Sequence, residues 1–109
     1  MIARSAAIAF VLGACNGAHP TKVKNDDSVE LFVRVHTSDG SLNWEGAIGP
    51  GSVASLRFRT DKDVTFRTSV YFAGQIVQER EKGYVSGSMI EQETCITVSR
   101  LNIVVSTCE

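Results

Sequence analysis

From Ser28 onward, apolar and polar residues alternate with a period of two, which is the pattern of half-buried β-strands. No stretch repeats its apolar residues with the period of a helix. Seven or eight short strands separated by turn residues predict an all-β fold, an antiparallel β-sandwich of immunoglobulin-like or transthyretin-like architecture. The stretches that alternate are 29–36, 44–48, 54–59, 64–72, 76–81, 84–85 and two within 95–108.

The first hairpin is predicted around Asp39-Gly40, because both residues tolerate a positive φ. A turn at this pair sets Val35 opposite Trp44 on the inner face of the sheet. On the outer face the same register sets Arg34 opposite Glu45, which is a favourable pair of opposite charges. The register therefore suits both faces at once.

A second hairpin is predicted around Asp61-Lys62-Asp63, a polar segment of a length that suits a short loop. Pairing centred on Lys62 sets Phe58 opposite Phe66. Both strands then bury the same face, and their polar residues point outward.

The outer face of this second hairpin is the predicted binding surface. Arg57, Arg59 and Arg67 share it, with Arg57 opposite Arg67. Like charges side by side are unfavourable, so the cluster indicates either an acidic partner or neutralisation by nearby carboxylates, and we favour neutralisation. Phe32 and Tyr71 also fall on outer faces, and exposed aromatic residues are typical of interfaces. The candidate partner-binding residues are therefore Arg57, Arg59, Arg67 and Tyr71.

The last third of the chain predicts further strands. Ile76–Glu81 is polar enough for an edge strand, since charges there discourage pairing with other chains. Lys82-Gly83 predicts a turn, and Ser86-Gly87-Ser88 predicts a break or bulge. Val, Ile and Thr dominate Cys95–Cys108, which predicts two strands joined near Leu101-Asn102.

The N-terminal segment has the features of a processing signal. Arg4 supplies a positive charge, and Ala6–Leu12 is an apolar run too short to span a bilayer as a helix. The run ends in Leu12-Gly13-Ala14-Cys15, which resembles the lipobox of bacterial lipoproteins. The resemblance implies diacylation of the Cys15 thiol, cleavage after Ala14 and attachment to a membrane. An ordinary secretory signal, cut further along after a residue such as Ala18, is the alternative.

By the sorting rule of that family, Asn16 points to the outer membrane. We expect the domain to face the periplasm, with exposure at the cell surface as the alternative. Residues 16–27 are polar, contain Gly17 and Pro20, and show no apolar period. They predict a flexible spacer in which His19 is solvated. The expected organisation is a signal peptide at 1–14, a lipidated tether at 15–27 and a β-sandwich domain at 28–109.

The chain contains three cysteines, Cys15, Cys95 and Cys108. Lipidation of Cys15 leaves two, and an exported protein is expected to pair them. The predicted turn between the last two strands brings Cys95 and Cys108 opposite each other. We therefore expect one disulfide, and no Cys/His spacing indicates zinc.

Composition narrows the function further. The chain has 11 basic and 12 acidic residues, so it lacks the basic excess of a nucleic-acid-binding protein. His36 with Ser38 and Asp39 is interpreted as turn chemistry rather than a catalytic triad. The carboxylate pairs Glu79/Glu81 and Glu91/Glu93 could bind a cation, although a solvated strand face is the simpler interpretation.

The sequence thus predicts a membrane-anchored lipoprotein of the cell envelope, without enzymatic activity or a cofactor. Its expected role is that of a protein-interaction module, an accessory or assembly subunit or an inhibitor, with an envelope protein as partner. The alternative function is that of a periplasmic carrier or sensor for a small ligand or a cation.

Overall fold

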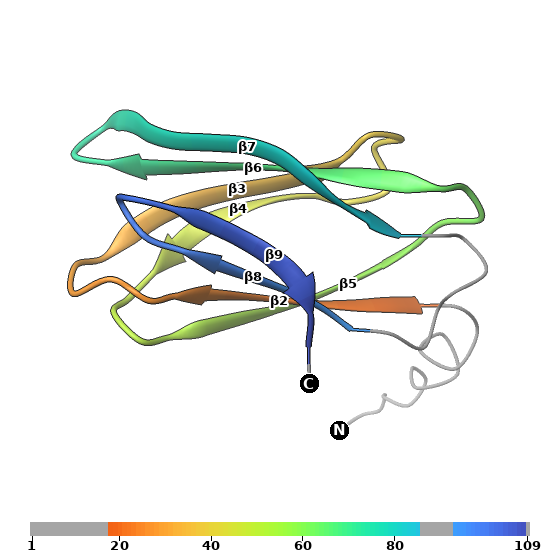
Figure 1. Ribbon diagram of the computed structural model, residues 1–109, viewed down its shortest axis with the longest axis horizontal. Helices are drawn as coiled ribbons and strands as arrows, with labels where there is room; N and C mark the ends of the chain where they lie inside the picture. The colour runs from red at the N-terminus through yellow and green to blue at the C-terminus, as the bar shows by residue number, and fades with distance from the viewer. Residues whose placement is uncertain (1–17, 86–92, 109) are drawn as a thin grey trace, which may run out of the picture.

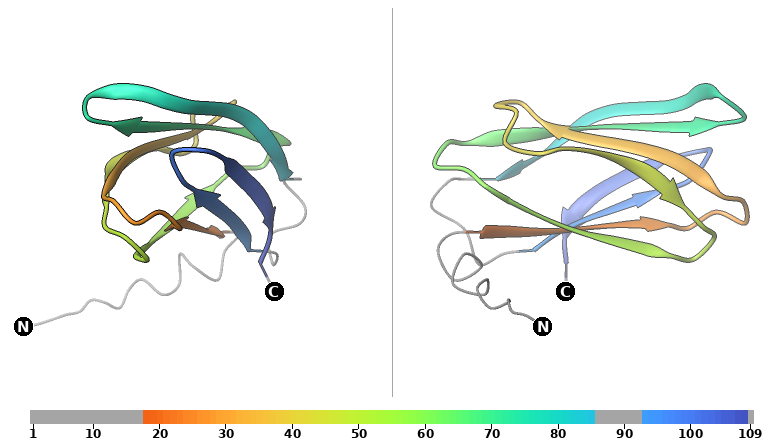
Figure 2. Two further views of the ribbon diagram at one scale, coloured as in Figure 1. Left: turned by 60° about the vertical axis from the view of Figure 1, so that its left-hand side comes forward. Right: turned by 180° about the vertical axis from the view of Figure 1, so that it is seen from behind.

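A computed structural model describes residues 18–85 and 93–108. These residues form two packed β-sheets and no helix (Figures 1 and 2), so the predicted all-β sandwich is confirmed. The strands within the described part are β2 (Ala18–Asn25), β3 (Leu31–Thr37), β4 (Asn43–Ile48), β5 (Val53–Arg59), β6 (Val64–Phe72), β7 (Gln75–Val85), β8 (Thr94–Val98) and β9 (Ile103–Thr107).

Sheet 1 has the strand order β5-β2-β8-β9, and sheet 2 has the order β4-β3-β6-β7. Neighbouring strands are antiparallel except β2 and β8, which run parallel. The core lies between the sheets, where aliphatic and aromatic side chains from both inner faces are buried. Its fully buried members include Val23, Leu31, Val33, Val35, Phe66, Val70, Ile96, Val98 and Ile103.

The first predicted hairpin is confirmed. Strands β3 and β4 pair with Val35 opposite Trp44 and with Arg34 opposite Glu45. Gly40 has a φ of 79° in the turn, a conformation that favours glycine. The turn chemistry and the alternation thus determine the register here.

The second predicted hairpin is wrong. Strand β5 pairs with β2 in sheet 1, whereas β6 pairs with β3 and β7 in sheet 2. Residues 60–63 therefore connect the two sheets. Phe58 and Phe66 still meet, but across the core, with ring centroids 5.8 Å apart and their planes nearly perpendicular.

The predicted flexible tether is also wrong for Ala18–Asn25, which form a central strand of sheet 1. Thr21, Val23 and Asn25 point into the core, whereas Lys22 and Lys24 are exposed. Only one of these three inward residues is apolar, and among them the side chain of Asn25 forms the hydrogen bonds. The domain thus includes residues that we expected in the spacer.

Strand β7 lies at the edge of sheet 2, as predicted, but it is longer than expected. The predicted turn at Lys82-Gly83 is wrong, because the strand continues to Val85. The pairing of β6 with β7 shifts by one residue beside Gly83, so that this glycine lies in a bulge. The predicted break at 86–88 lies outside the described residues.

The predicted disulfide between Cys95 and Cys108 is confirmed, with the two Cα atoms 5.0 Å apart. Strands β8 and β9 form the expected pair around Leu101-Asn102. Cys95 lies opposite Ser106, so the bridge joins a diagonal pair rather than a directly opposed one. Cys108 follows the last residue of β9, and its backbone N–H donates to the carbonyl oxygen of Glu93.

Four connections, 26–30, 49–52, 73–74 and 99–102, lie together at the end of the sandwich opposite the start of β2 (Figure 1). We call this the distal end. The buried Asn25 side chain organises it: its Nδ2 donates to the carbonyl oxygens of Val29 and Ile48, both at 2.8 Å. Its Oδ1 accepts from the backbone N–H of Asp27 at 2.8 Å.

The predicted signal at 1–14 and the predicted lipidation at Cys15 lie outside the described residues. Within the described part, no helix is long and apolar enough to span a bilayer.

Candidate functional site

An apolar row crosses the outer face of sheet 2. It consists of Ala47, Phe32, Tyr71 and Ile76, which lie directly opposite one another on the four neighbouring strands. Phe32 remains 41% exposed and Ile76 51% exposed, although both are large hydrophobic residues. The rings of Phe32 and Tyr71 pack edge to face at 5.9 Å. Contiguous apolar residues on an outer face are unusual unless a partner covers them.

A pocket of about 330 Å³ adjoins the apolar row near the distal end. Phe32, Ala47 and Tyr71 of the row line it, together with Glu30, Leu31, Phe72, Ala73 and Gly74. Ala73 and Gly74 both have positive φ, as in the two-residue turns that join the strands of a β-hairpin. The pocket therefore combines apolar walls with a single carboxylate, that of Glu30.

Two polar rows lie beside the apolar row on the same face. Glu45, Arg34, Ser69 and Glu79 form one, and Asn43, His36, Arg67 and Glu81 form the other. Arg67 lies 3.5 Å from Glu79 and 3.4 Å from Glu81, and the Ser69 hydroxyl donates to Glu79 at 3.1 Å. Exposed ion pairs of this kind contribute little to stability, but they keep this part of the face hydrated.

The predicted arginine cluster does not exist as we expected it. Arg57 and Arg59 lie on β5 in sheet 1, whereas Arg67 and Tyr71 lie on β6 in sheet 2. The error follows from the second hairpin, because β5 and β6 belong to different sheets. Glu79 and Glu81 neutralise Arg67, which is the structural interpretation that we favoured. Tyr71 belongs to the apolar row.

Arg100 and Asp27 form an ion pair at the distal end, between the turn that joins β8 to β9 and the connection that leads from β2 to β3. The guanidinium of Arg100 donates from Nε and Nη2 to the two carboxylate oxygens of Asp27 at 3.1 and 3.0 Å. The backbone N–H of Arg100 donates to the same carboxylate at 2.8 Å. The guanidinium also lies 5.0 Å from the ring centroid of Phe72, a pocket residue, as in cation–π contacts. This cluster thus supports the wall of the pocket.

The Asp27–Arg100 pair should make stability depend on pH. The hydrogen bonds from Arg100 hold the pKa of Asp27 well below its usual range. The pair therefore stabilises the fold above the pKa of an unfolded aspartate, about 3.9, and this contribution is lost as the pH falls below it. We expect Asp27→Asn to be destabilised at neutral pH and to approach the native protein on acidification. Urea unfolding at several pH values would measure this convergence.

Asp26→Asn is the matched control for that experiment, because Asp26 is the adjacent residue and is exposed. It should leave the free energy of unfolding almost unchanged near neutral pH. A difference between native protein and Asp27→Asn that stayed constant on acidification would contradict the assigned role of the ion pair.

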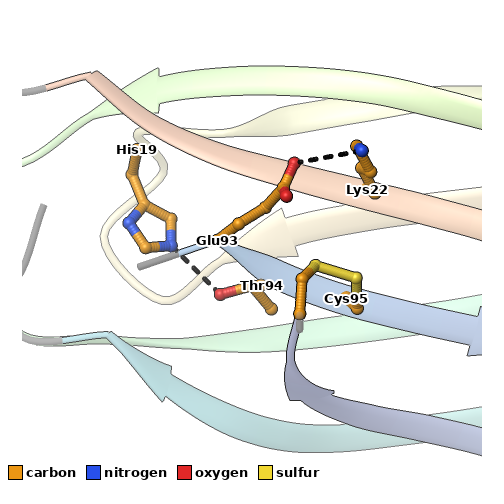
Figure 3. Close-up of a disulfide and its surroundings, with 6 residues drawn as sticks. His19, Lys22, Glu93, Thr94 and Cys95 are labelled. Atoms are coloured by element: carbon orange, nitrogen blue, oxygen red, sulfur yellow. Dashed lines mark hydrogen bonds and ion pairs between the residues drawn. A yellow bond between two sulfur atoms is a disulfide. The ribbon is translucent and has the colours of Figure 1, made fainter. Parts of the chain in front are cut away.

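His19 is buried, so its predicted solvation is wrong. Figure 3 shows its ring directed from β2 toward Thr94 on β8, and Nε2 lies 3.0 Å from the Thr94 hydroxyl. Phe58 packs against the ring with centroids 5.2 Å apart. Burial lowers the pKa of His19, which favours the neutral ring. Its position between two sheets and its contacts assign it a role in packing.

Glu79 and Glu81, the first of the two carboxylate pairs, are exposed to solvent on β7. Glu79 and Glu81 contact Arg67, and Glu93 lies 3.8 Å from Lys22. Glu91 lies outside the described residues. Among residues 18–85 and 93–108, no three His, Cys, Asp or Glu side chains are grouped to hold a metal ion. Asp39 accepts hydrogen bonds from Thr37, Ser41 and Thr60, which is the expected turn chemistry.

No protein-family model and no curated protein matches this chain. The solved structures that resemble it include "Structure of a disulfide locked mutant of Intermedilysin with human CD59" (TM-score 0.43, 9% identity), "Crystal Structure of Gram Negative Toxin" (0.38, 12%) and "Trapped Toxin" (0.40, 9%). Each match covers 84% of this chain but only 23–24% of the other, so the chain spans about a quarter of their length. At these TM-scores the likeness carries no argument about function.

Of the expected site residues, only Tyr71 joins the candidate site. Glu30, Phe72 and Ile76 are site residues that the sequence reasoning did not select. A two-residue turn at Ala73-Gly74 sets Ile76 opposite Tyr71 on the outer face, and this was the signal that could have found one of them.

Proposed function

We propose that this protein is a lipid-anchored, non-catalytic binding module of the bacterial cell envelope. Its partner is a protein that covers the apolar row and the adjoining pocket. The observation that carries this proposal is the alignment of Phe32, Tyr71 and Ile76 across an outer sheet face. Aromatic residues in such a position are typical of the energetic centre of an interface, with polar residues at its rim.

The Glu30 carboxylate and the polar rows define the chemistry of the partner. Glu30 is the one charged residue that lines the pocket, and it is exposed. A partner that places an apolar side chain in the pocket and a basic group beside Glu30 would match both the apolar walls of the pocket and its carboxylate. The partner class is therefore a protein segment with a large apolar residue next to Lys or Arg.

The anchor in this proposal is a diacylglyceryl group on Cys15, as the resemblance of Leu12-Gly13-Ala14-Cys15 to a lipobox implies. Several acyl chains hold a protein firmly to a bilayer, whereas one does not. We expect the mature protein to begin at Cys15 and to carry the mass of that adduct. Mass spectrometry of the N-terminal peptide measures this, and an unmodified peptide that begins at a later residue would contradict it.

Phe32→Ala should weaken partner binding about 10- to 30-fold, as expected for an aromatic residue at the centre of an interface. Its effect on stability should be about 1–2 kcal/mol, because the residue is 41% exposed and the substitution removes the packing of its ring against Tyr71. Recovery of the partner from detergent-solubilised membranes, with a photo-reactive residue at position 71, would measure binding.

Leu101→Ala is the matched control, because Leu101 is an aliphatic residue that is 87% exposed and lies outside the apolar row. It should change neither partner recovery nor stability. Equal recovery with Phe32→Ala and with the native protein would contradict the proposed interface.

A small ligand is the second candidate, because the volume of the pocket falls within the range of small-molecule sites. Ile76 separates the two functions: it belongs to the apolar row but does not line the pocket. Ile76→Ala should weaken a protein partner that covers the row and leave the binding of a small ligand unchanged.

A further inference from the structure

The two outer faces of the sandwich differ in charge. The strands of sheet 1 contain four basic residues, Lys22, Lys24, Arg57 and Arg59, and no carboxylate. All four are exposed and alternate with inward residues, so they share the outer face. We call this surface the basic face. On the outer face of sheet 2, by contrast, Arg34 and Arg67 alternate with Glu45, Glu79 and Glu81.

The register places these cations close together. Lys22 and Lys24 lie on β2, opposite Ser55 and Val53 of the neighbouring strand β5, and Arg57 lies opposite Pro20. Glu93, which precedes β8, lies 3.8 Å from Lys22. Cations gathered at this density attract a surface of negative charge.

Apolar side chains accompany the charges. Val53, Lys24, Thr97 and Val104 form a row across all four strands of sheet 1. Val53 and Val104 are each about half exposed. Basic residues beside exposed aliphatic ones are typical of surfaces that rest on lipid headgroups.

The position of Cys15 decides between a membrane and an acidic protein as the occupant. Ala18, where β2 begins, follows Cys15 by three residues, so even a fully extended chain separates their Cα atoms by only about 11 Å. A lipid on Cys15 therefore holds the start of β2, a central strand of sheet 1, close to the bilayer, and brings the basic face within reach of the headgroups. We propose that the basic face docks on anionic phospholipid headgroups. This inference rests on the lipid anchor of the proposed function.

Docking of this kind would set the orientation of the domain. With sheet 1 on the headgroups, sheet 2 lies on the opposite side of the sandwich, as the two layers in Figure 2 show. The apolar row then faces away from the membrane. One surface thus contacts lipid, and the other remains open to a protein partner.

The test uses the full chain with Cys15→Ser, which cannot be acylated, and vesicles of phosphatidylcholine with or without phosphatidylglycerol. We expect it to sediment preferentially with the anionic vesicles and to dissociate at high salt, which screens surface charge. Lys24→Gln should weaken anionic binding about fivefold, and Lys24→Gln with Arg57→Gln about 30-fold, because each basic residue near a charged membrane contributes a similar factor. The apolar N-terminal run is common to all variants and cancels in these ratios.

Lys82→Gln is the matched control, because it removes the same charge from an exposed residue on the edge strand of sheet 2. It should leave vesicle binding unchanged. Equal binding to neutral and anionic vesicles, or an equal loss with Lys82→Gln and Lys24→Gln, would overturn the proposal and leave an acidic protein as the occupant of the basic face. The mass of the Cys15 peptide tests the lipid anchor independently, so the two failures are distinguishable.

A second measurement reports orientation in the acylated protein. After reconstitution into anionic vesicles, Lys24 should react more slowly with a water-soluble amine reagent than Lys82 does. The difference should shrink in vesicles of phosphatidylcholine alone. Equal reactivity of the two lysines in anionic vesicles would also overturn docking.

Discussion

Replacing Asn25 with Ala is expected to lower the free energy of unfolding by about 3 kcal/mol. The substitution removes both donors to the carbonyl oxygens of Val29 and Ile48, and the acceptor for the N–H of Asp27. Partners left unsatisfied in a buried site each cost about 1–3 kcal/mol, and water that enters the site can recover part of this. Urea-induced unfolding followed by the fluorescence of Trp44 would measure the change.

Asn25→Asp separates the hydrogen bonds from the loss of volume. It retains the acceptor and nearly the same shape but has no N–H to offer the two carbonyl groups near neutral pH. It should therefore be destabilised at least as much as the alanine variant. Asn43→Ala, at an exposed position on β4, should change stability by less than about 0.5 kcal/mol. Similar stabilities of the native protein and both Asn25 variants would show that this network does not hold the distal end together.

Removing the disulfide is expected to destabilise the domain by a comparable amount. Cys95 and Cys108 lie 13 positions apart in the sequence, and closing a loop of this length stabilises a fold by about 3 kcal/mol in the chain-entropy model. This is a large share of the stability of a small domain. The double variant Cys95→Ala with Cys108→Ala should therefore unfold at a markedly lower urea concentration than the oxidised native protein.

A reductant provides the control for this prediction. Dithiothreitol should lower the unfolding midpoint of the native protein toward that of the double variant, and it should leave the double variant unchanged. An unfolding midpoint of the native protein that does not depend on the reductant would contradict a stabilising role for the bridge.

The sequence predicts which face a residue occupies better than which strand lies beside it. The register of β3 and β4 follows from two independent signals, the Asp39-Gly40 turn and the match on both faces. For Phe58 and Phe66 the same alternation is compatible with a hairpin and with a connection between sheets, since either buries both rings. Alternation thus reports burial, and the partner of a strand depends on contacts distant in sequence.

Strand β2 escaped prediction because its inward positions are mostly polar. Thr21 and Asn25 are buried on either side of Val23, so the hydrophobic signal is reduced to one residue. The alternation of Lys22 and Lys24 with Thr21 and Val23 was nevertheless present. What the sequence could not show is that β8, far along the chain, provides a hydroxyl for His19.

The candidate site was predictable only in part. Parity placed Phe32 and Tyr71 on outer faces, and both belong to the apolar row. The row itself depends on the strand order β4-β3-β6-β7, in which β3 and β6 are neighbours although two strands separate them in the chain. The basic face was missed for a similar reason, because Lys22 and Lys24 were assigned to a spacer.

The parallel pairing of β2 with β8 would constrain the order of folding events in the export that we propose. His19 and Thr94, which meet across this pair, are 75 residues apart in the chain. In such an export, sheet 1 could not close until β8 had emerged from the translocation channel, and closing so long a loop is entropically costly and slow. In the proposed lipoprotein, Cys15 would therefore remain accessible to the modifying enzymes while most of the polypeptide is still being delivered.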